Sequence, residues 1–167
     1  MGDVYGLEEL EITLDKMADI DLKKPMRKAV EMVEATAKAN APVHNGTLRS
    51  RIGGDVRTDG TAVVGEVTAD ASYAAYVEFG TGPKGAQNHE GVSPNVEINY
   101  RSTPWYIPED ELPPDAIKDY HWKKFTTKDG KTFYICYGQP AQPFMYPAIK
   151  DNEENVKALF KGEIEKS

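Results

Sequence analysis

The run Tyr-Ala-Ala-Tyr-Val-Glu-Phe-Gly-Thr, residues 73–81, constrains the fold more than any other stretch of this chain. It is apolar and aromatic, with a single carboxylate. Alternate positions fit a half-buried strand, but Tyr73, Tyr76 and Phe79 also recur at helical spacing. We predict one helical turn over residues 73–75 and a buried strand over residues 76–79, followed by a chain reversal at Gly80.

Glu78 is the single charge within this apolar run. A carboxylate is costly to bury without a partner. We therefore expect Glu78 to meet a cation, with Arg49 and Arg51 as the candidates, from the same subunit or from a neighbour. The alternative is that the run is an ordinary core strand and nothing more.

Length and charge narrow the class of protein. The 167 residues suit one domain with a reasonable core. A formal net charge of −7 disfavours a general nucleic-acid or membrane-surface binder, because such proteins carry basic faces. Cys136 is the only cysteine, which suits a reducing compartment and a small apolar core residue. No secretory leader and no apolar run of ~20 residues is visible, so we expect a soluble protein made in the cytoplasm.

Two helices are predicted before the sheet. Residues 7–18 place Leu7, Leu10, Leu14 and Met17 on one helical face. A second helix starts near Pro25, which suits a first turn, and ends before Pro42. Its predicted apolar face consists of Leu22, Met26, Ala29, Val30, Val33 and Ala37.

The next segment predicts a hairpin. Its first strand covers about residues 49–57, with a bulge at Gly53-Gly54. Asp59-Gly60 forms the turn, and the second strand covers residues 62–68. The strand at residues 76–79 is expected to join this sheet.

Residues 82–142 have the character of an insert. Residues 82–99 are rich in Gly, Pro and Asn, and we expect a mobile loop there. An aromatic strand bounded by prolines, within residues 100–108, suits a sheet edge. Residues 121–126 and 131–137 flank Lys128-Asp-Gly130 as a second hairpin. The second arm is apolar on both faces, so another surface must cover it.

The chain ends in a predicted helix with Pro147 at its first position. Its expected apolar stripe consists of Ala148, Ile149, Val156, Leu159, Phe160 and Ile164. The predicted fold class is therefore α+β: a small, curved antiparallel sheet packed against an N-terminal and a C-terminal helix, with a long loop-and-hairpin insert. We predict one domain over residues 1–167, made of N-terminal helices (1–40), sheet core (41–81), insert (82–142) and C-terminal helix (143–167).

Three segments carry a family resemblance. They are Ala-Pro-Val-His-Asn-Gly-Thr-Leu-Arg-Ser-Arg-Ile (41–52), the run at residues 73–81, and Gln-Pro-Phe-Met-Tyr-Pro-Ala-Ile (142–149). In this order and spacing, the chain resembles the HK97 gp10-like tail-completion proteins of tailed bacteriophages. The resemblance implies a non-enzymatic structural protein at the virion neck, assembled in the host bacterial cytoplasm, which forms a ring that is typically hexameric.

The partners implied by the resemblance are other copies of the chain, the head connector, and the tail tube or terminator proteins. DNA would pass without specific binding, since adhesion to DNA comes from phosphate neutralisation by Lys and Arg. We expect no catalytic residue, cofactor, metal, small-molecule substrate or membrane contact. The candidate subunit or partner interface consists of Glu78, Phe79, Trp105, Tyr106, Phe133, Ile135 and Tyr137.

Other chemistry finds little support. His44, His89 and His121 lack metal-ligand spacing, and the glycine-rich run after Phe79 lacks the spacing of a phosphate loop. No set of nucleophile, base and orienting group can be assembled. The rival hypothesis is a nucleic-acid-binding accessory protein that uses the hairpin at residues 118–134. Its lysines (118, 123, 124, 128 and 131) interleave with Tyr120, Trp122, Phe125 and Phe133, although nearby aspartates reduce the local charge.

Overall fold

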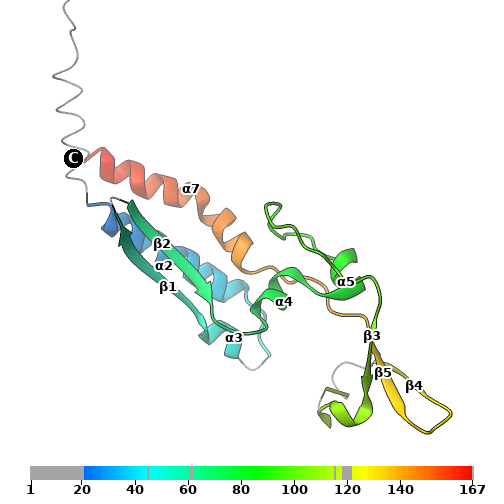
Figure 1. The fold of residues 1–167 in the computed structure, drawn as a ribbon. Coiled ribbons are helices and arrows are strands. Elements are labelled where there is room, and N and C mark those ends of the chain that lie inside the picture. The colour runs from blue at the N-terminus through cyan, green and yellow to red at the C-terminus, as the bar shows by residue number, and fades with distance from the viewer. Residues whose placement is uncertain (1–20, 45, 61, 115, 118–121, 167) are drawn as a thin grey trace, which may run out of the picture. The chain divides into compact units, whose positions relative to one another are not determined.

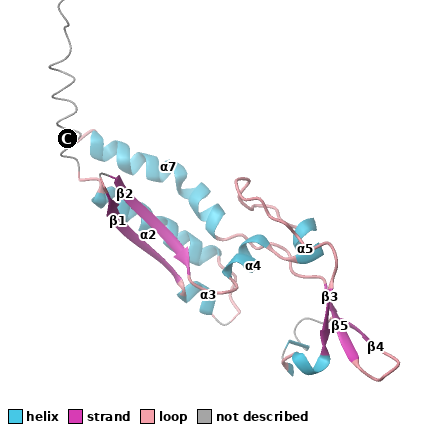
Figure 2. Ribbon diagram, viewed as in Figure 1, coloured by secondary structure: helices cyan, strands magenta, loops and turns pink. Residues whose placement is uncertain are grey.

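The computed structural model describes residues 21–44, 46–60, 62–114, 116–117 and 122–166. The fold is α+β, as predicted, and consists of helices with two small antiparallel sheets (Figures 1 and 2). The described chain divides into two compact units, one formed by the described residues up to 70 with those from 147 onward and the other by those between 71 and 146. The prediction of a single domain over residues 1–167 stays a prediction. The helix expected at residues 7–18 lies outside the described residues.

The first unit pairs a helix with a hairpin (Figure 1). Helix α2 covers Lys23–Asn40 and ends before Ala41-Pro42, as the sequence predicted. Its buried residues include Ala29, Val30 and Ala37, which belong to the predicted apolar face. Strands β1 (Ile52–Asp59) and β2 (Ala62–Ala69) pair antiparallel around the predicted turn at residues 59–60, and α2 packs against both strands.

The start of β1 differs from the prediction. Residues Thr47–Ser50 form a short helix, α3, so the strand begins at Ile52 rather than at residue 49. The predicted bulge at Gly53-Gly54 is also wrong, because every residue of β1 has one partner on β2. Gly54 serves another purpose: a Cβ there would collide with the side chain of Val30. The glycine therefore permits the close approach of α2 to the sheet.

Helix α7 (Met145–Ile164) contributes its residues from Pro147 onward to this unit. The buried Asn152 connects it to α2, since its Nδ2 donates to Thr36 Oγ1 at 2.9 Å and to the Ala148 carbonyl at 2.8 Å. The helix begins two residues before the predicted start, which places Pro147 third. Pro147 still lies in the first turn, where an N–H would lack an intrahelical acceptor.

The second unit is built from short elements. Residues Ala74–Phe79 form helix α4, so the predicted strand at residues 76–79 is wrong and no third strand joins β1 and β2 within the described chain. Residues Gly82–Gln87 form helix α5, where we had expected only loop. In α4, the structure therefore follows the helical spacing of Tyr73, Tyr76 and Phe79 and not the strand-like alternation of the same run.

The second sheet of the molecule contains three strands in the order β3-β5-β4. Strand β3 occupies the predicted edge position, and β4 and β5 form the predicted hairpin. A 3-10 turn, η1, follows β3. The bounds are β3 Trp105–Pro108, η1 Glu109–Glu111, β4 Lys123–Thr126 and β5 Thr132–Cys136.

Candidate functional site: a carboxylate clamp and an aromatic sheet face

Glu78 lies near the end of α4 with 5% of its surface exposed. Its Oε2 accepts hydrogen bonds from the backbone N–H groups of Phe144 at 2.7 Å and Met145 at 2.9 Å. Its Oε1 accepts a third from the N–H of Tyr146 at 3.0 Å. We call this arrangement the Glu78 clamp. It joins the second and third of the three sequence segments that carry the family resemblance.

The clamp supplies what the start of a helix needs. The first N–H groups of an α-helix have no intrahelical acceptor, and the helix dipole favours negative charge there. Glu78 satisfies three of these groups from a segment more than 60 residues earlier. Pro147, the next residue, has no N–H to satisfy. These amides therefore stabilise a buried carboxylate, and no side-chain cation of the described residues pairs with it.

This arrangement corrects the predicted pairing of Glu78 with Arg49 or Arg51. Arg51 instead lies 3.6 Å from the carboxylate of Asp70, and Arg49 donates to the Ala41 carbonyl at 3.3 Å. The prediction considered only charged side chains as partners. Three converging backbone amides can stabilise a carboxylate equally well, and no sequence pattern of charges reveals them.

Further hydrogen bonds attach the segment after β5 to α4 and α5. The Val77 carbonyl accepts from the N–H of Gln142 at 2.8 Å, and the Tyr76 carbonyl accepts from Gln139 Nε2 at 2.7 Å. Gly80, with φ of +72°, lies so close to Ala141 and Gln139 that a Cβ would not fit. The turn at Gly80 is thus as predicted, although a helix rather than a strand precedes it. Sequence analysis missed Gln139.

The second part of the site is one face of the β3-β5-β4 sheet. Directly paired residues of an antiparallel sheet place their side chains on the same face. The register pairs Tyr106 with Ile135 and Phe125 with Phe133, so all four share a face. The Phe125 ring lies 5.7 Å from that of Phe133, stacked, and 5.8 Å from that of Tyr106, edge to face. We call these four residues the aromatic face.

The aromatic face is not covered by the described chain. Tyr106 is 59% exposed and Phe125 is 41% exposed, while Phe133 and Ile135 are half-buried. The opposite face is sheltered: Tyr134 is buried and donates from its hydroxyl to Glu109 Oε1 at 3.1 Å. The described residues therefore do not enclose this face of the hairpin arm.

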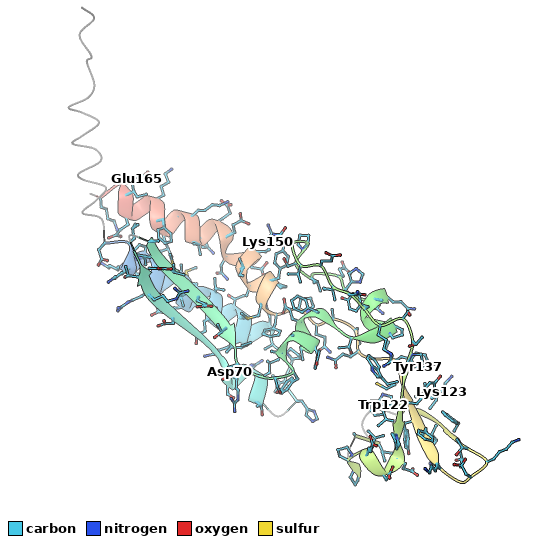
Figure 3. All side chains as sticks on the ribbon, viewed as in Figure 1. Asp70, Trp122, Lys123, Tyr137, Lys150 and Glu165 are labelled. Atoms are coloured by element: carbon cyan, nitrogen blue, oxygen red, sulfur yellow. The ribbon has the colours of Figure 1, made fainter. Side chains whose placement is uncertain are left out.

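The structure brings together three of the seven predicted interface residues. Tyr106, Phe133 and Ile135 lie on the aromatic face, and Phe125, which was not predicted as an interface residue, completes it. Trp105 lies on the opposite face, since it pairs with Cys136. The remaining residues are Glu78 in the clamp, the half-buried Phe79 and the exposed Tyr137, which follows β5 (Figure 3). Whether the seven residues form an interface stays a prediction.

Two lysines of the rival nucleic-acid hypothesis begin strand β4, where Figure 3 labels Lys123 next to Trp122. Lys124 is engaged within the subunit, because its ammonium lies 3.6 Å from Glu109 and 5.7 Å from the centre of the Tyr134 ring. Two aromatics of the hairpin, Phe125 and Phe133, stack on each other. Lys118, Tyr120 and His121 lie outside the described residues. Titration with short DNA at two salt concentrations would test the hypothesis, which requires a steep salt dependence.

The part of the chain that the structure describes offers little for other kinds of chemistry. No group of three or more His, Cys, Asp or Glu residues there is arranged to hold a metal ion. His89 Nδ1 lies 3.3 Å from the Gly85 carbonyl, and Cys136 is half-buried in β5. Among the described helices, none is both long enough and apolar enough to cross a membrane.

The described residues form an α+β protein with an exposed aromatic sheet face, a surface suited to contact with another protein. Residues 8–80 match the model of a protein family described as Bacteriophage HK97-gp10, putative tail-component. The match covers a little less than half of the chain and confirms the resemblance inferred from the sequence. It includes the first of the three segments and all but the last residue of the second, and it stops before the third. The match indicates a structural component of a phage tail, and hence a virion protein. Searches among curated proteins and among solved structures returned no match.

Proposed function

We propose that this protein is a tail-completion subunit that joins head and tail as one member of a ring, and that the aromatic face contacts the next copy of the chain in that ring. The observation that carries the proposal is the match of residues 8–80 to the phage tail-component family. The head connector and the tail tube or terminator proteins are the further partners. The subunit acts by holding neighbours in place rather than by catalysis.

The composition of the aromatic face supports a role in protein contact. Tyr and Phe are enriched in the cores of protein interfaces, where large rings bury much area at a small cost in conformational entropy. The rings of Phe125, Phe133 and Tyr106 already pack against one another, so little rotamer freedom remains to be lost on binding. The charged groups nearby, including Lys123, would lie at the polar rim.

The charge of the chain supports the passage of DNA through such a ring. With a formal net charge of −7, the 27 acidic residues outnumber the 20 Lys and Arg residues that could neutralise phosphates, and adhesion to DNA depends on that neutralisation. A ring of acidic subunits would let DNA slide past without being held. This part of the proposal requires that binding to short DNA stays weak even at low salt.

The experiment is co-assembly of purified protein with the head connector and with the tail proteins of the same phage, followed by sedimentation and electron microscopy. The double variant Tyr106→Ala/Phe125→Ala should lose at least tenfold in assembly, whereas its melting temperature should stay close to that of the wild type. The matched control is Tyr76→Ala, since Tyr76 and Tyr106 are each 59% exposed. The control should assemble normally.

Two results would contradict the proposal in different ways. Normal assembly of the double variant would remove the aromatic face from the interface but leave the ring function intact. Failure of the wild-type protein to assemble with either the connector or the tail proteins would remove the function itself. A monomer in isolation is compatible with a ring that closes only on its partners.

A further inference from the structure

Helix α7 has apolar residues that the described chain leaves uncovered. Of its 20 residues, the buried ones are Ala148 and Asn152. Ile149, a member of the predicted apolar stripe, is 54% exposed, and Val156 and Phe160 of the same stripe are only half-buried. Figure 3 labels the charged residue Lys150 near the start of α7 and Glu165 directly after its end. An amphipathic helix normally buries its apolar stripe against a neighbour, and α7 does so on one side only.

A groove of about 150 Å³ separates the end of α7 from the beginning of α2. The α2 side of the groove is formed by the first turns of that helix, immediately after the point where the described chain begins at Asp21. The chain that precedes α2 therefore starts next to the second half of α7. The residues that line the groove are Lys24, Pro25, Lys28, Ala158, Leu159, Gly162, Glu163 and Lys166.

The beginning of α2 is strongly basic. Lys23, Lys24, Arg27 and Lys28 lie in its first turns, and the first turn holds no acidic residue. Positive charge at a helix N-terminus is unfavourable because of the helix dipole. None of these four side chains has a carboxylate within 4 Å among the described residues, in contrast to the lysines of α7. An acidic neighbour would relieve this charge.

The segment before α2 is both acidic and amphipathic, as the basic beginning of α2 and the uncovered apolar stripe of α7 require. Residues 1–20 contain six acidic residues and one lysine. Residues 7–18 place Leu7, Leu10, Leu14 and Met17 on one face of the helix that the sequence predicts. A helix of 12 residues is about 18 Å long and α7, with 20 residues, is about 30 Å long. The segment can thus run along the second half of α7.

We propose that residues 7–18 dock as an acidic amphipathic helix on α7 of the same subunit, with Leu10 and Leu14 over Val156 and Phe160. The acidic flank would then face the basic beginning of α2. One contact accounts for the uncovered stripe of α7, for the lack of a described carboxylate beside the basic side chains at the start of α2, and for the amphipathic pattern of the N-terminal segment. The short link, residues 19–22, favours docking within one subunit over exchange between subunits.

Spin-label distances in the full chain test the docking. In a Cys136→Ser background, Ile12→Cys and Lys157→Cys place one label opposite the apolar face of residues 7–18 and one on the exposed side of α7. Packed helices lie 8–10 Å apart, so a narrow distribution centred at roughly 20–25 Å between the labels is expected. Leu10→Ala/Leu14→Ala should broaden it, whereas the matched control Glu8→Gln/Lys16→Gln, on the polar side, should not.

The outcomes separate the possible occupants of α7. A distribution that is equally broad in the wild type and in Leu10→Ala/Leu14→Ala would overturn the proposal. A short distance that disappears on dilution with unlabelled protein would also overturn it, because the segment would then dock on a second copy. Lys24→Glu/Lys28→Glu should broaden the distribution at low salt. The difference from wild type should disappear at high salt, because salt screens the charge pairing, and a difference that persists would contradict that pairing.

Discussion

The unit that contains α2, β1 and β2 is held together mainly by apolar side chains, whereas the unit of residues 71–146 depends heavily on hydrogen bonds between distant segments. In the first, Val30 packs toward Gly54 and Gly65 across the helix–sheet interface. In the second, the Glu78 clamp and the bonds of Gln139 and Gln142 connect segments more than 60 residues apart. The periodicity of apolar residues in a sequence predicts apolar packing, but it does not predict hydrogen bonds between distant segments.

The largest expected effect tests whether the second unit also has an apolar centre. Phe144, which is 0% exposed, is its largest fully buried side chain. Phe144→Ala should lower the free energy of unfolding by about 3–5 kcal/mol, because transfer and cavity costs add. Urea denaturation measures the change. Phe125→Ala, at a ring that is 41% exposed, is the control and should cost much less. A loss at Phe144 as small as the loss at Phe125 would show that Phe144 is not an apolar centre of this unit.

The next effect addresses the clamp. Glu78→Gln keeps the shape of the side chain but replaces one acceptor with an NH₂ group that faces backbone N–H groups. The loss should be about 2–3 kcal/mol, since hydrogen bonds to a charged group are strong and the amides remain buried. Hydrogen exchange at Phe144, Met145 and Tyr146 should accelerate more than elsewhere. Glu97→Gln, at an exposed position of the same unit, provides the control. An unchanged exchange rate at the three amides would show that the clamp is dispensable.

Adjacent glycines in β1 give a sharper test of the first unit. Gly54→Ala would drive a methyl group into Val30, and the overpacking should cost about 1–2 kcal/mol. Gly53→Ala points to the other face, where nothing lies within 4 Å of the new Cβ. It should be neutral or stabilise by up to about 1 kcal/mol, because alanine restricts the unfolded chain. Thermal melts compare the two. Changes of the same sign would refute the close approach of α2 at Gly54.

The smallest effect concerns the outer surface of α7. Lys157 and Lys150, at 3.0 and 3.1 Å, hold the pKa of Glu153 below its ordinary value. The stabilisation is therefore present above the unfolded-state pKa and is lost as the pH falls through the lower folded-state pKa. Glu153→Gln should reduce slightly the loss of melting temperature between neutral and acidic pH. The difference should vanish in high salt, because these groups are exposed. A difference that persists in high salt would argue against screened surface pairs.

Particular residues show why the sequence predicted one unit better than the other. Alternation and an Asp-Gly turn located β1 and β2, and apolar spacing located α2, because each pattern reports burial against one neighbour. The run at residues 73–81 fitted both periods, and its helical form is accompanied by bonds from Gln139 and Gln142 to its carbonyls. Sequence spacing contains no information on such partners.

The sequence likewise predicted some features of the candidate site and not others. The sequence identified Tyr106, Phe133 and Ile135 from their apolar strands, but only the pairing register placed them with Phe125 and moved Trp105 to the other side. The sequence also marked Glu78 as a buried charge in need of a partner. It could not choose between a side-chain cation and backbone amides, because both satisfy a carboxylate.

Local patterns by themselves determined the α+β class, the two hairpins, the helix that packs on the first sheet and the family resemblance, which the match over residues 8–80 confirms. Only the tertiary structure decided that residues 74–79 are helical and that Glu78 stabilises the start of α7. It also decided which aromatic rings share an exposed face. The physical reason is that apolar periodicity depends on near neighbours, three or four residues away on a helix and two on a strand. The hydrogen bond between Glu78 and Phe144 depends instead on the path of the 65 residues that separate them.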